Sequence, residues 1–265
     1  MNSPESVLAH MCDNLETQIA NEKNPDVIKK HIDDANFFYF YKHIDTEHKN
    51  MESLVHYYML SSKLKGKVRS DWDSTHWNVK SARAESVAEH VYGTCMLALA
   101  MDSEHEFHID LERVIKMLTL HETREVLISD IEPFEGITQD IKKSIEHQAT
   151  RTVLGDLIYN EAYYNLCLEF DEVKTTDSIF AHYCDKLEKD LQSKIYQDTG
   201  CHQSLDNQSY NIYFNNPKAR QILANGATTA FDIVYESDRT LYDEEEESKP
   251  FGKVLDYVRY KNTNI

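Results

Sequence analysis

The sequence predicts an all-α fold, a bundle of helices joined by short polar loops. Its 265 residues include only 7 glycines and 5 prolines, fewer than a β-rich chain with many tight turns requires. Several long segments place apolar residues at helical spacing. With 41% hydrophobic residues, the chain can bury a sizeable core. We therefore expect one helical domain with additional helices at both ends.

The expected helices are recognised from their apolar period and from start and stop signals. Residues 1–48 form one or two of them, with a break at Asn24-Pro25. Asp110 is expected to cap the helix that follows it, and Thr138 to cap another. The acidic run 243–247 is expected to be a solvated loop. After residue 48, the predicted helices cover 52–65, 84–103, 111–121, 138–160, 175–198, 217–235 and 252–260.

Changes in composition suggest three parts. Residues 1–48 form an N-terminal helical extension, 49–200 form the core, and 201–265 form a C-terminal helical extension packed on the core. The boundary near 200 follows from the polar, loop-like sequence beyond Gly200. An aromatic run at 37–41 is predicted to pack on the core, and the alternative is a homodimer contact.

The charge balance restricts the partners. Asp and Glu number 46 against 28 Lys and Arg, a net charge of −18, which argues against nucleic acid or an anionic membrane as a partner. A small phosphate ester stays compatible, because a metal and a few arginines can dominate the field inside a pocket. Five cysteines without a Cys-x-x-Cys pair, together with the lack of a visible signal peptide, predict a reduced, cytoplasmic protein.

Histidines and carboxylates on three separate predicted helices suggest a shared metal ion. His90 lies in the first of these helices, His121 and Glu122 lie at the end of the second, and Asp185 lies in the third. Adjacent residues on a helix point about 100° apart, so His121 and Glu122 can face one ion only at a helix end or bend. Two imidazoles and two carboxylates suit one divalent Mn, Fe, Co, Ni or Zn ion better than calcium, and Mg²⁺ is a further candidate.

The order of these motifs resembles the HD-domain phosphohydrolases. In that family a His precedes a His-Asp doublet and a distant Asp, with a Glu three and an Asp eight residues after the doublet. The run Arg83-Ala-Glu-Ser-Val-Ala-Glu-His90 is similar to words of the 5′-deoxynucleotidase branch, and the resemblance spans roughly residues 50–200. It implies an HD-domain helical bundle that removes phosphate from 5′-deoxynucleoside monophosphates with the help of a metal. The alternatives are a nucleoside triphosphate phosphohydrolase and a nucleotide- or metal-binding regulatory module without turnover.

The resemblance also implies roles for individual residues. His90, His121, Glu122 and Asp185 match the metal ligands. Glu125 would orient the attacking water or pass a proton to the leaving group.

Further roles concern the substrate. Asp130 is expected to accept a hydrogen bond from the sugar 3′-hydroxyl. Arg69 would grip the phosphate, and Trp72 would crowd the sugar 2′ position. Arg83 is placed with the substrate-binding residues, and its alternative is an ion pair with Glu85.

Two positions differ from the family's sequence motifs. Glu122 replaces the usual Asp, which adds one methylene and moves the carboxylate outward by about 1.5 Å; we expect the helix end to accommodate this change. Asp71 replaces a glycine between Arg69 and Trp72. No basic cluster suited to three phosphates is recognisable in the sequence, which favours a monophosphate.

Overall fold

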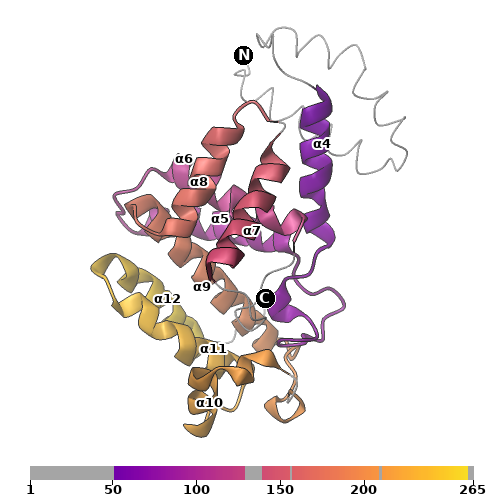
Figure 1. Ribbon diagram of the computed structural model, residues 1–265. Coiled ribbons are helices and arrows are strands. Elements are labelled where there is room, and N and C mark those ends of the chain that lie inside the picture. Colours follow the sequence, from indigo (N-terminus) through magenta and orange to yellow (C-terminus); the bar gives the residue numbers. More distant parts are fainter. Residues whose placement is uncertain (1–50, 129–138, 156, 209–210, 262–265) are drawn as a thin grey trace, which may run out of the picture. The chain divides into compact units, whose positions relative to one another are not determined.

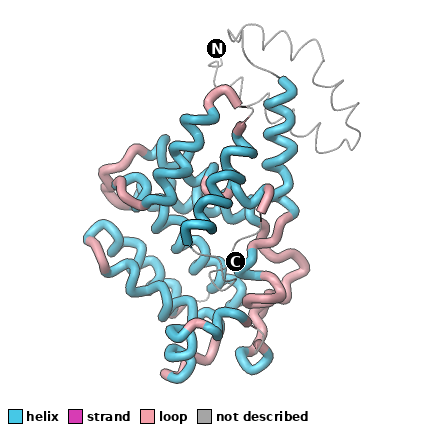
Figure 2. The backbone as a smooth tube through the Cα atoms, viewed as in Figure 1, coloured by secondary structure: helices cyan, strands magenta, loops and turns pink. Residues whose placement is uncertain are grey.

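The computed structural model describes residues 51–128, 139–155, 157–208 and 211–261 (Figure 1). The chain divides into two units, Met1–Val55 and His56–Ile265, and the second is described below. The described residues form helices and loops (Figure 2), and their one β-type pairing is an isolated bridge between Val68 and Ser86. The all-α prediction is therefore confirmed.

The helices keep the labels of Figure 1. They are α4 (Met51–Ser61), α5 (Val87–Glu104), α6 (Leu111–Leu120), α7 (Gln139–Leu154), α8 (Asn160–Glu172), α9 (Thr176–Asp198), α10 (Pro217–Ala224), α11 (Ala230–Asp238) and α12 (Lys249–Arg259). None of the described helices has the length and apolar character that crossing a membrane requires.

Helix α9 is the centre of the His56–Ile265 unit. It packs against α5, α6, α8, α11 and α12. Thr175 begins it with a reciprocal capping box to Ser178, which satisfies two backbone N–H groups at the helix start. Fully buried side chains from these helices surround it, among them Ala98, Val114, Met117, Leu118, Ala181, Leu187, Phe251 and Leu255.

Helix α5 begins three residues later than predicted. Ser86 caps it through a capping box with Glu89, while the residues just before it are extended. The backbone N–H of Arg69 donates to the Glu85 carbonyl, and that of Val87 donates to the Lys67 carbonyl. These two bonds hold the segment that carries Arg69 against the start of α5.

The predicted helix over 138–160 is shorter in the structure. Helix α7 ends at Leu154, and the proposed cap Thr138 lies outside the described residues. Helix α8 was not predicted, because its Tyr, Asn, Cys and Phe residues are poor helix formers. Packing stabilises α8 instead, since Tyr164, Leu166, Cys167 and Phe170 are buried.

The single helix predicted over 217–235 is wrong. The chain forms α10 and α11, separated at Gly226, whose φ of 101° lies in a region that favours glycine. Thr229 then starts α11 with a capping box to Asp232. Helix α12 begins at Lys249 rather than at 252, and Pro250 fits its first turn. The acidic run 243–247 is exposed as expected, although short 3₁₀ turns include its two ends.

Residues beyond 200 pack on α9 through α11 and α12. They also build a second apolar cluster with the segment before α5, and its buried members are Trp72, Trp77, Val79, Tyr196, Ala219, Ile222, Ala230, Ile233 and Val234. The three-part division at residues 48 and 200 stays a prediction. The aromatic run 37–41, and with it the predicted homodimer contact, lies outside the described residues.

A partly buried histidine that packs against this second cluster makes the fold sensitive to acid. Burial lowers the pKa of His202 to about 4, although a hydrogen bond from Nε2–H to the Ser193 carbonyl partly opposes the shift. The unfolded chain binds this proton near pH 6.5, so the contribution of His202 to stability is complete above pH 6.5 and is lost as the pH falls towards 4.

We expect the free energy of unfolding to fall between pH 6.5 and 4 by roughly 2 kcal/mol on account of this residue, after allowance for its partial exposure. His202→Gln keeps a hydrogen-bond donor but cannot titrate, so its stability should decline less over this range. Urea unfolding of both proteins at several pH values measures the difference. Equal slopes would exclude His202 as the cause.

Candidate metal centre

Three helices bring the predicted ligands together. His90 lies in the first turn of α5 and is completely buried, and Asp185 lies in α9. Helix α6 ends at Leu120, His121 follows as its C-cap, and Glu122 leaves helical geometry with φ −97° and ψ 11°. The helix end required for His121 and Glu122 to face the same point is therefore present.

The four side chains place their donor atoms close to one another. His90 Nε2 lies 2.9 Å from Asp185 Oδ1, 3.4 Å from His121 Nε2 and 3.9 Å from Glu122 Oε1. His121 Nε2 lies 3.6 Å from Glu122 Oε1 and 3.8 Å from Asp185 Oδ1. Ligands that share an ion at about 2.1 Å are separated by roughly 3 to 3.5 Å. The cluster thus needs only small adjustments to hold a divalent ion.

The Nδ1 atom of each imidazole has a hydrogen-bond partner that orients the ring. His121 Nδ1–H donates to the Leu118 carbonyl at 2.7 Å. His90 Nδ1–H donates to Glu188 Oε2, one turn beyond Asp185 on α9. His121 Nε2 is consequently left with a lone pair that faces the cluster. His90 Nε2–H donates to Asp185, and the hydrogen bonds to Asp185 and Glu188 outweigh burial and raise the pKa of His90 to about 9. A bound ion would replace this Nε2 proton, which gives the usual arrangement of histidine ligands.

The charge states suit metal binding as well. Burial lowers the pKa of His121 and keeps its imidazole neutral. Burial alone would raise the pKa of Asp185, but the hydrogen bond from His90 and the Lys186 charge hold it well below its usual range. Burial is likewise outweighed at Glu122, where nearby positive charges, among them Arg124 and Arg69, lower the pKa of the carboxyl. Two ionised carboxylates and neutral His121 therefore match the donors that transition metals prefer.

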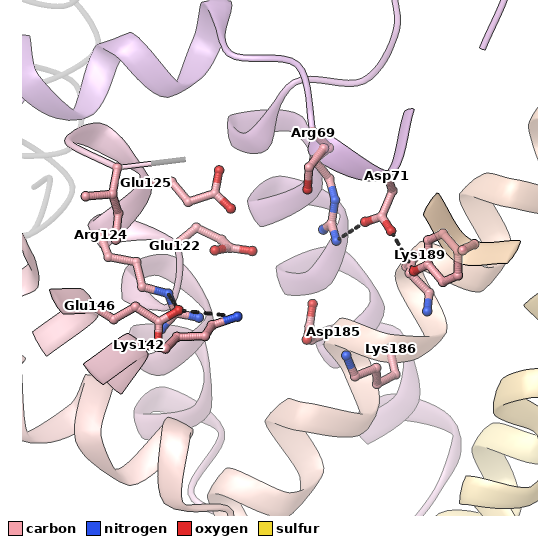
Figure 3. A pocket seen from close by; sticks show the side chains of 13 residues that line it. Arg69, Asp71, Glu122, Arg124, Glu125, Lys142, Glu146, Asp185, Lys186 and Lys189 are labelled. Carbon is pink, nitrogen blue, oxygen red and sulfur yellow. Dashed lines mark hydrogen bonds and ion pairs between the residues drawn. The ribbon is translucent and has the colours of Figure 1, made fainter. Parts of the chain in front are cut away.

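A cavity of about 280 Å³ opens beside this cluster (Figure 3). Glu122 and Asp185 lie on its wall, between Arg124 and Lys142 on one side and Arg69 and Asp71 on the other (Figure 3). The full lining consists of Arg69, Ser70, Asp71, Glu122, Arg124, Glu125, Ile128, Lys142, Glu146, Asp185, Lys186, Lys189 and Tyr213.

Five of the lining residues are cationic, although the sequence showed no basic cluster, because they come from separate segments. Four of them are paired: Arg69 with Asp71, Arg124 with Asp171, Lys142 with Glu146, and Lys189 with Asp238. Lys186 forms no ion pair with a carboxylate in the part of the chain that the structure describes. Its position next to Asp185 in the sequence was the signal that could have identified it.

Arg69 lines the cavity and carries a buried N–H group. Its Nη2 donates to Asp71 Oδ2 at 3.0 Å, while Nη1 is buried and has no hydrogen-bond partner among the described residues. Asp71 also accepts a hydrogen bond from the Tyr213 hydroxyl at 3.2 Å. The charge of Arg69 overcomes the effect of burial and lowers the pKa of Asp71 to about 2. The negative charge of Asp71, which replaces the family's glycine, is thus compensated by Arg69 and by the hydrogen bond from Tyr213.

Glu125 lies on the cavity wall, where its carboxylate is 3.2 Å from Lys67 Nζ. Lys67 also donates to the carbonyls of Glu125 and Ile128, which ties down the 3₁₀ turn after Glu122. Asp130, the second residue predicted to be catalytic, lies outside the described residues.

Two residues predicted to bind substrate do not reach the cavity. Trp72 is 2% exposed and its indole N–H donates to Glu85 Oε2 at 2.8 Å, because the ring packs against Tyr196 in the second apolar cluster. The Arg83 side chain is 81% exposed and pairs with Glu89 rather than with Glu85. Burial and the charge of Glu188 raise the pKa of Glu85 to about 8.

Loss of one imidazole should disrupt the cluster. We expect His121→Ala to lower the affinity for Mn²⁺ or Zn²⁺ by more than about 100-fold, beyond the 10- to 100-fold that loss of a supporting partner causes. His147→Ala provides the control, since His147 is partly exposed and pairs with Asp171. Competition with a chromophoric chelator measures both affinities. Unchanged binding in His121→Ala would place the ion elsewhere.

Comparison with known proteins agrees with this geometry. A family model described as HD domain matches residues 61–222. Curated relatives include a 5′-deoxynucleotidase of Dictyostelium discoideum, 28% identical over 156 residues, which cover 56% of this chain and 79% of the relative. The 5′-deoxynucleotidase of Schizosaccharomyces pombe is 26% identical over 151 residues, 55% of this chain and 73% of the relative. A human 5′-deoxynucleotidase is 25% identical over 148 residues, covering 55% and 69%.

Solved structures share the fold. A protein of Pyrococcus horikoshii aligns with a TM-score of 0.55 and 21% identity over 78% of this chain and 99% of its own. A conserved hypothetical protein of Pyrococcus furiosus gives a TM-score of 0.54 and 19% identity, with 78% and 99% coverage.

Proposed function

The chain belongs to the HD domain family, and we propose that it is a metal-dependent phosphohydrolase that removes the phosphate of 5′-deoxynucleoside monophosphates. One observation carries the proposal: the donor cluster of His90, His121, Glu122 and Asp185 adjoins a cavity that Arg69 lines. Nη1 of Arg69 is buried and has no hydrogen-bond partner among the described residues. The relatives named 5′-deoxynucleotidases support the substrate class.

The four residues of the cluster would hold one Mn, Co, Fe, Ni or Zn ion, with Mg²⁺ as a further candidate. When bound, such an ion would polarise a phosphate oxygen and lower the pKa of a water molecule in the cavity. The remaining steps fall to the side chains of the chain itself.

Arg69 and Lys186 bind the phosphate. The free Nη1–H of Arg69 donates to one phosphoryl oxygen and Lys186 supplies a second positive charge. These charges neutralise the negative charge that grows on the phosphoryl oxygens during the reaction. Since Arg124, Lys142 and Lys189 are already paired, the cavity is better suited to one phosphate than to three.

Glu125 acts first as the general base and then as the general acid. Its carboxylate accepts a proton from the attacking water as the new P–O bond forms, and returns it to the sugar 5′ oxygen as the old P–O bond breaks. The products are inorganic phosphate and a deoxynucleoside. Lys67 holds this carboxylate at the cavity wall, and Asp130 is retained as the proposed acceptor for the sugar 3′-hydroxyl. A cytoplasmic location also stays a prediction.

A substrate panel tests the proposal. Metal-stripped protein should release phosphate from deoxynucleoside monophosphates only after addition of a divalent ion, and much less from ribonucleoside monophosphates or from triphosphates. Phosphate release across the panel, with Mn²⁺, Co²⁺, Zn²⁺ and Mg²⁺ in turn, measures this preference. Preferred hydrolysis of triphosphates would favour the alternative substrate class.

Two arginine variants distinguish phosphate binding by Arg69 from a general effect of removing positive surface charge. Arg69→Ala should lower kcat/KM by about 10²- to 10³-fold, as expected for loss of a preorganised donor. Arg83→Ala should change kcat/KM less than about threefold, because its guanidinium is exposed and paired with Glu89. Equal losses in the two variants would contradict the role of Arg69.

Glu122→Asp tests whether the longer side chain is accommodated. The shorter carboxylate withdraws from the two Nε2 atoms that Glu122 now approaches within 4 Å, so we expect weaker metal binding and lower activity. Metal titration and phosphate release measure both. A large gain in hydrolysis would instead indicate that the natural chain is a binding or regulatory module with a compromised site.

A further inference from the structure

Glu188 lies immediately behind the candidate metal centre. It is on α9, three residues after Asp185, and is 8% exposed. His90 contacts both residues with different nitrogens: Nε2 faces Asp185, and Nδ1–H donates to Glu188 Oε2. One imidazole ring is therefore held between two carboxylates of the same helix.

Gly93 permits this contact. It lies on α5, three residues after His90, and a Cβ added there would lie 2.5 Å from Glu188 Oε1 and 3.0 Å from its Cγ. Distances under 3.0 Å are not tolerated, so any side chain at position 93 would displace the Glu188 carboxylate. A glycine inside a helix costs about 1 kcal/mol relative to alanine, which fits a position that needs the space.

The Glu85 carboxylate also lies close to Glu188 and His90. Carboxylate oxygens of Glu85 and Glu188 and a ring nitrogen of His90 lie within 4.8 Å of one another. Glu85 is itself held by the Trp72 indole N–H and by its own backbone N–H, which donates to the Tyr196 hydroxyl. The Glu188 carboxylate is thus confined between the α5 backbone and Glu85.

We propose that Glu188 is a positioning residue that accepts the Nδ1–H of His90 and fixes the orientation of the ring, with Nε2 towards the metal centre, and that Gly93 is required because it admits the Glu188 carboxylate. The proposal rests on the metal centre of the proposed function. Trp72 accordingly supports the metal centre indirectly, because its indole N–H holds Glu85, and it does not touch the substrate.

The first test is the affinity for Zn²⁺ of the full chain, measured by chelator competition. Glu188→Gln has nearly the same shape but lacks the charge, and we expect it to bind Zn²⁺ about 10- to 100-fold more weakly. Glu112→Gln makes the same change at a side chain that is 78% exposed and should bind as the natural protein does. Natural affinity in Glu188→Gln would overturn the proposal.

Gly93 is tested with a double-mutant cycle. Gly93→Ala should weaken Zn²⁺ binding by a similar factor in the natural chain, but should have no further effect in a Glu188→Ala background, where the obstructing carboxylate is absent. Gly66→Ala is the matched control, because a Cβ at Gly66 meets nothing within 4 Å. Equal losses in both backgrounds would show that Gly93 acts through packing alone and would overturn its assigned role.

A spectroscopic readout distinguishes positioning from general stability. In the Zn²⁺-loaded protein the Nδ1–H proton of His90 should give a downfield, slowly exchanging ¹H resonance, because it donates to Glu188. In Glu188→Ala this resonance should move upfield or exchange rapidly with solvent, while circular dichroism stays that of a folded helical protein. An unchanged Nδ1–H resonance in Glu188→Ala would contradict the proposal.

These measurements also distinguish failure of the proposed function from failure of the role assigned to Glu188. If the natural chain binds no divalent ion, both the proposed function and this inference fail. If the natural chain binds Zn²⁺ tightly and hydrolyses its substrate but Glu188→Gln does the same, only the inference fails.

Discussion

Helix α9 carries charged side chains into the interior, and a buried charge is tolerated only where a partner compensates it. Asp185 and Glu188 both meet His90 of α5, and Lys189 meets Asp238 at the end of α11. Because these partners come from distant parts of the chain, the need for compensation fixes how their helices lie against α9. The candidate metal centre and the basic wall of the cavity both follow from this one electrostatic requirement.

The two positions at which this sequence departs from the family's motifs, Glu122 and Asp71, are accommodated in different ways. At Glu122, the end of α6 leaves helical geometry and turns the longer side chain towards both imidazoles. At Asp71, a carboxylate that replaces a glycine is neutralised by Arg69 and accepts a hydrogen bond from Tyr213. Tyr213 comes from the segment after α9, so this part of the chain contributes directly to the cavity.

Local sequence information was sufficient for the start of α6 and for the ligand order, whereas α5 begins three residues later than predicted. Ser86 and Asp110 cap α5 and α6, and the adjacency of His121 and Glu122 required the helix end that the structure has. Long-range contacts were not predictable in this way. The burial of Trp72, the exposure of Arg83 and the approach of Tyr213 to Asp71 depend on packing between distant segments. Helix α8 was missed for the same reason, since tertiary contacts outweigh its weak intrinsic propensity.

The close approach of Glu188 to Gly93 has a consequence for the order in which the chain can change during evolution. Any side chain at position 93 meets the carboxylate as long as Glu188 is present. A shorter residue at position 188 removes the obstacle, after which position 93 is free to vary. The two sites are therefore epistatic, and the accessible mutational path runs through position 188 first, with His90 acquiring another partner for Nδ1 along the way.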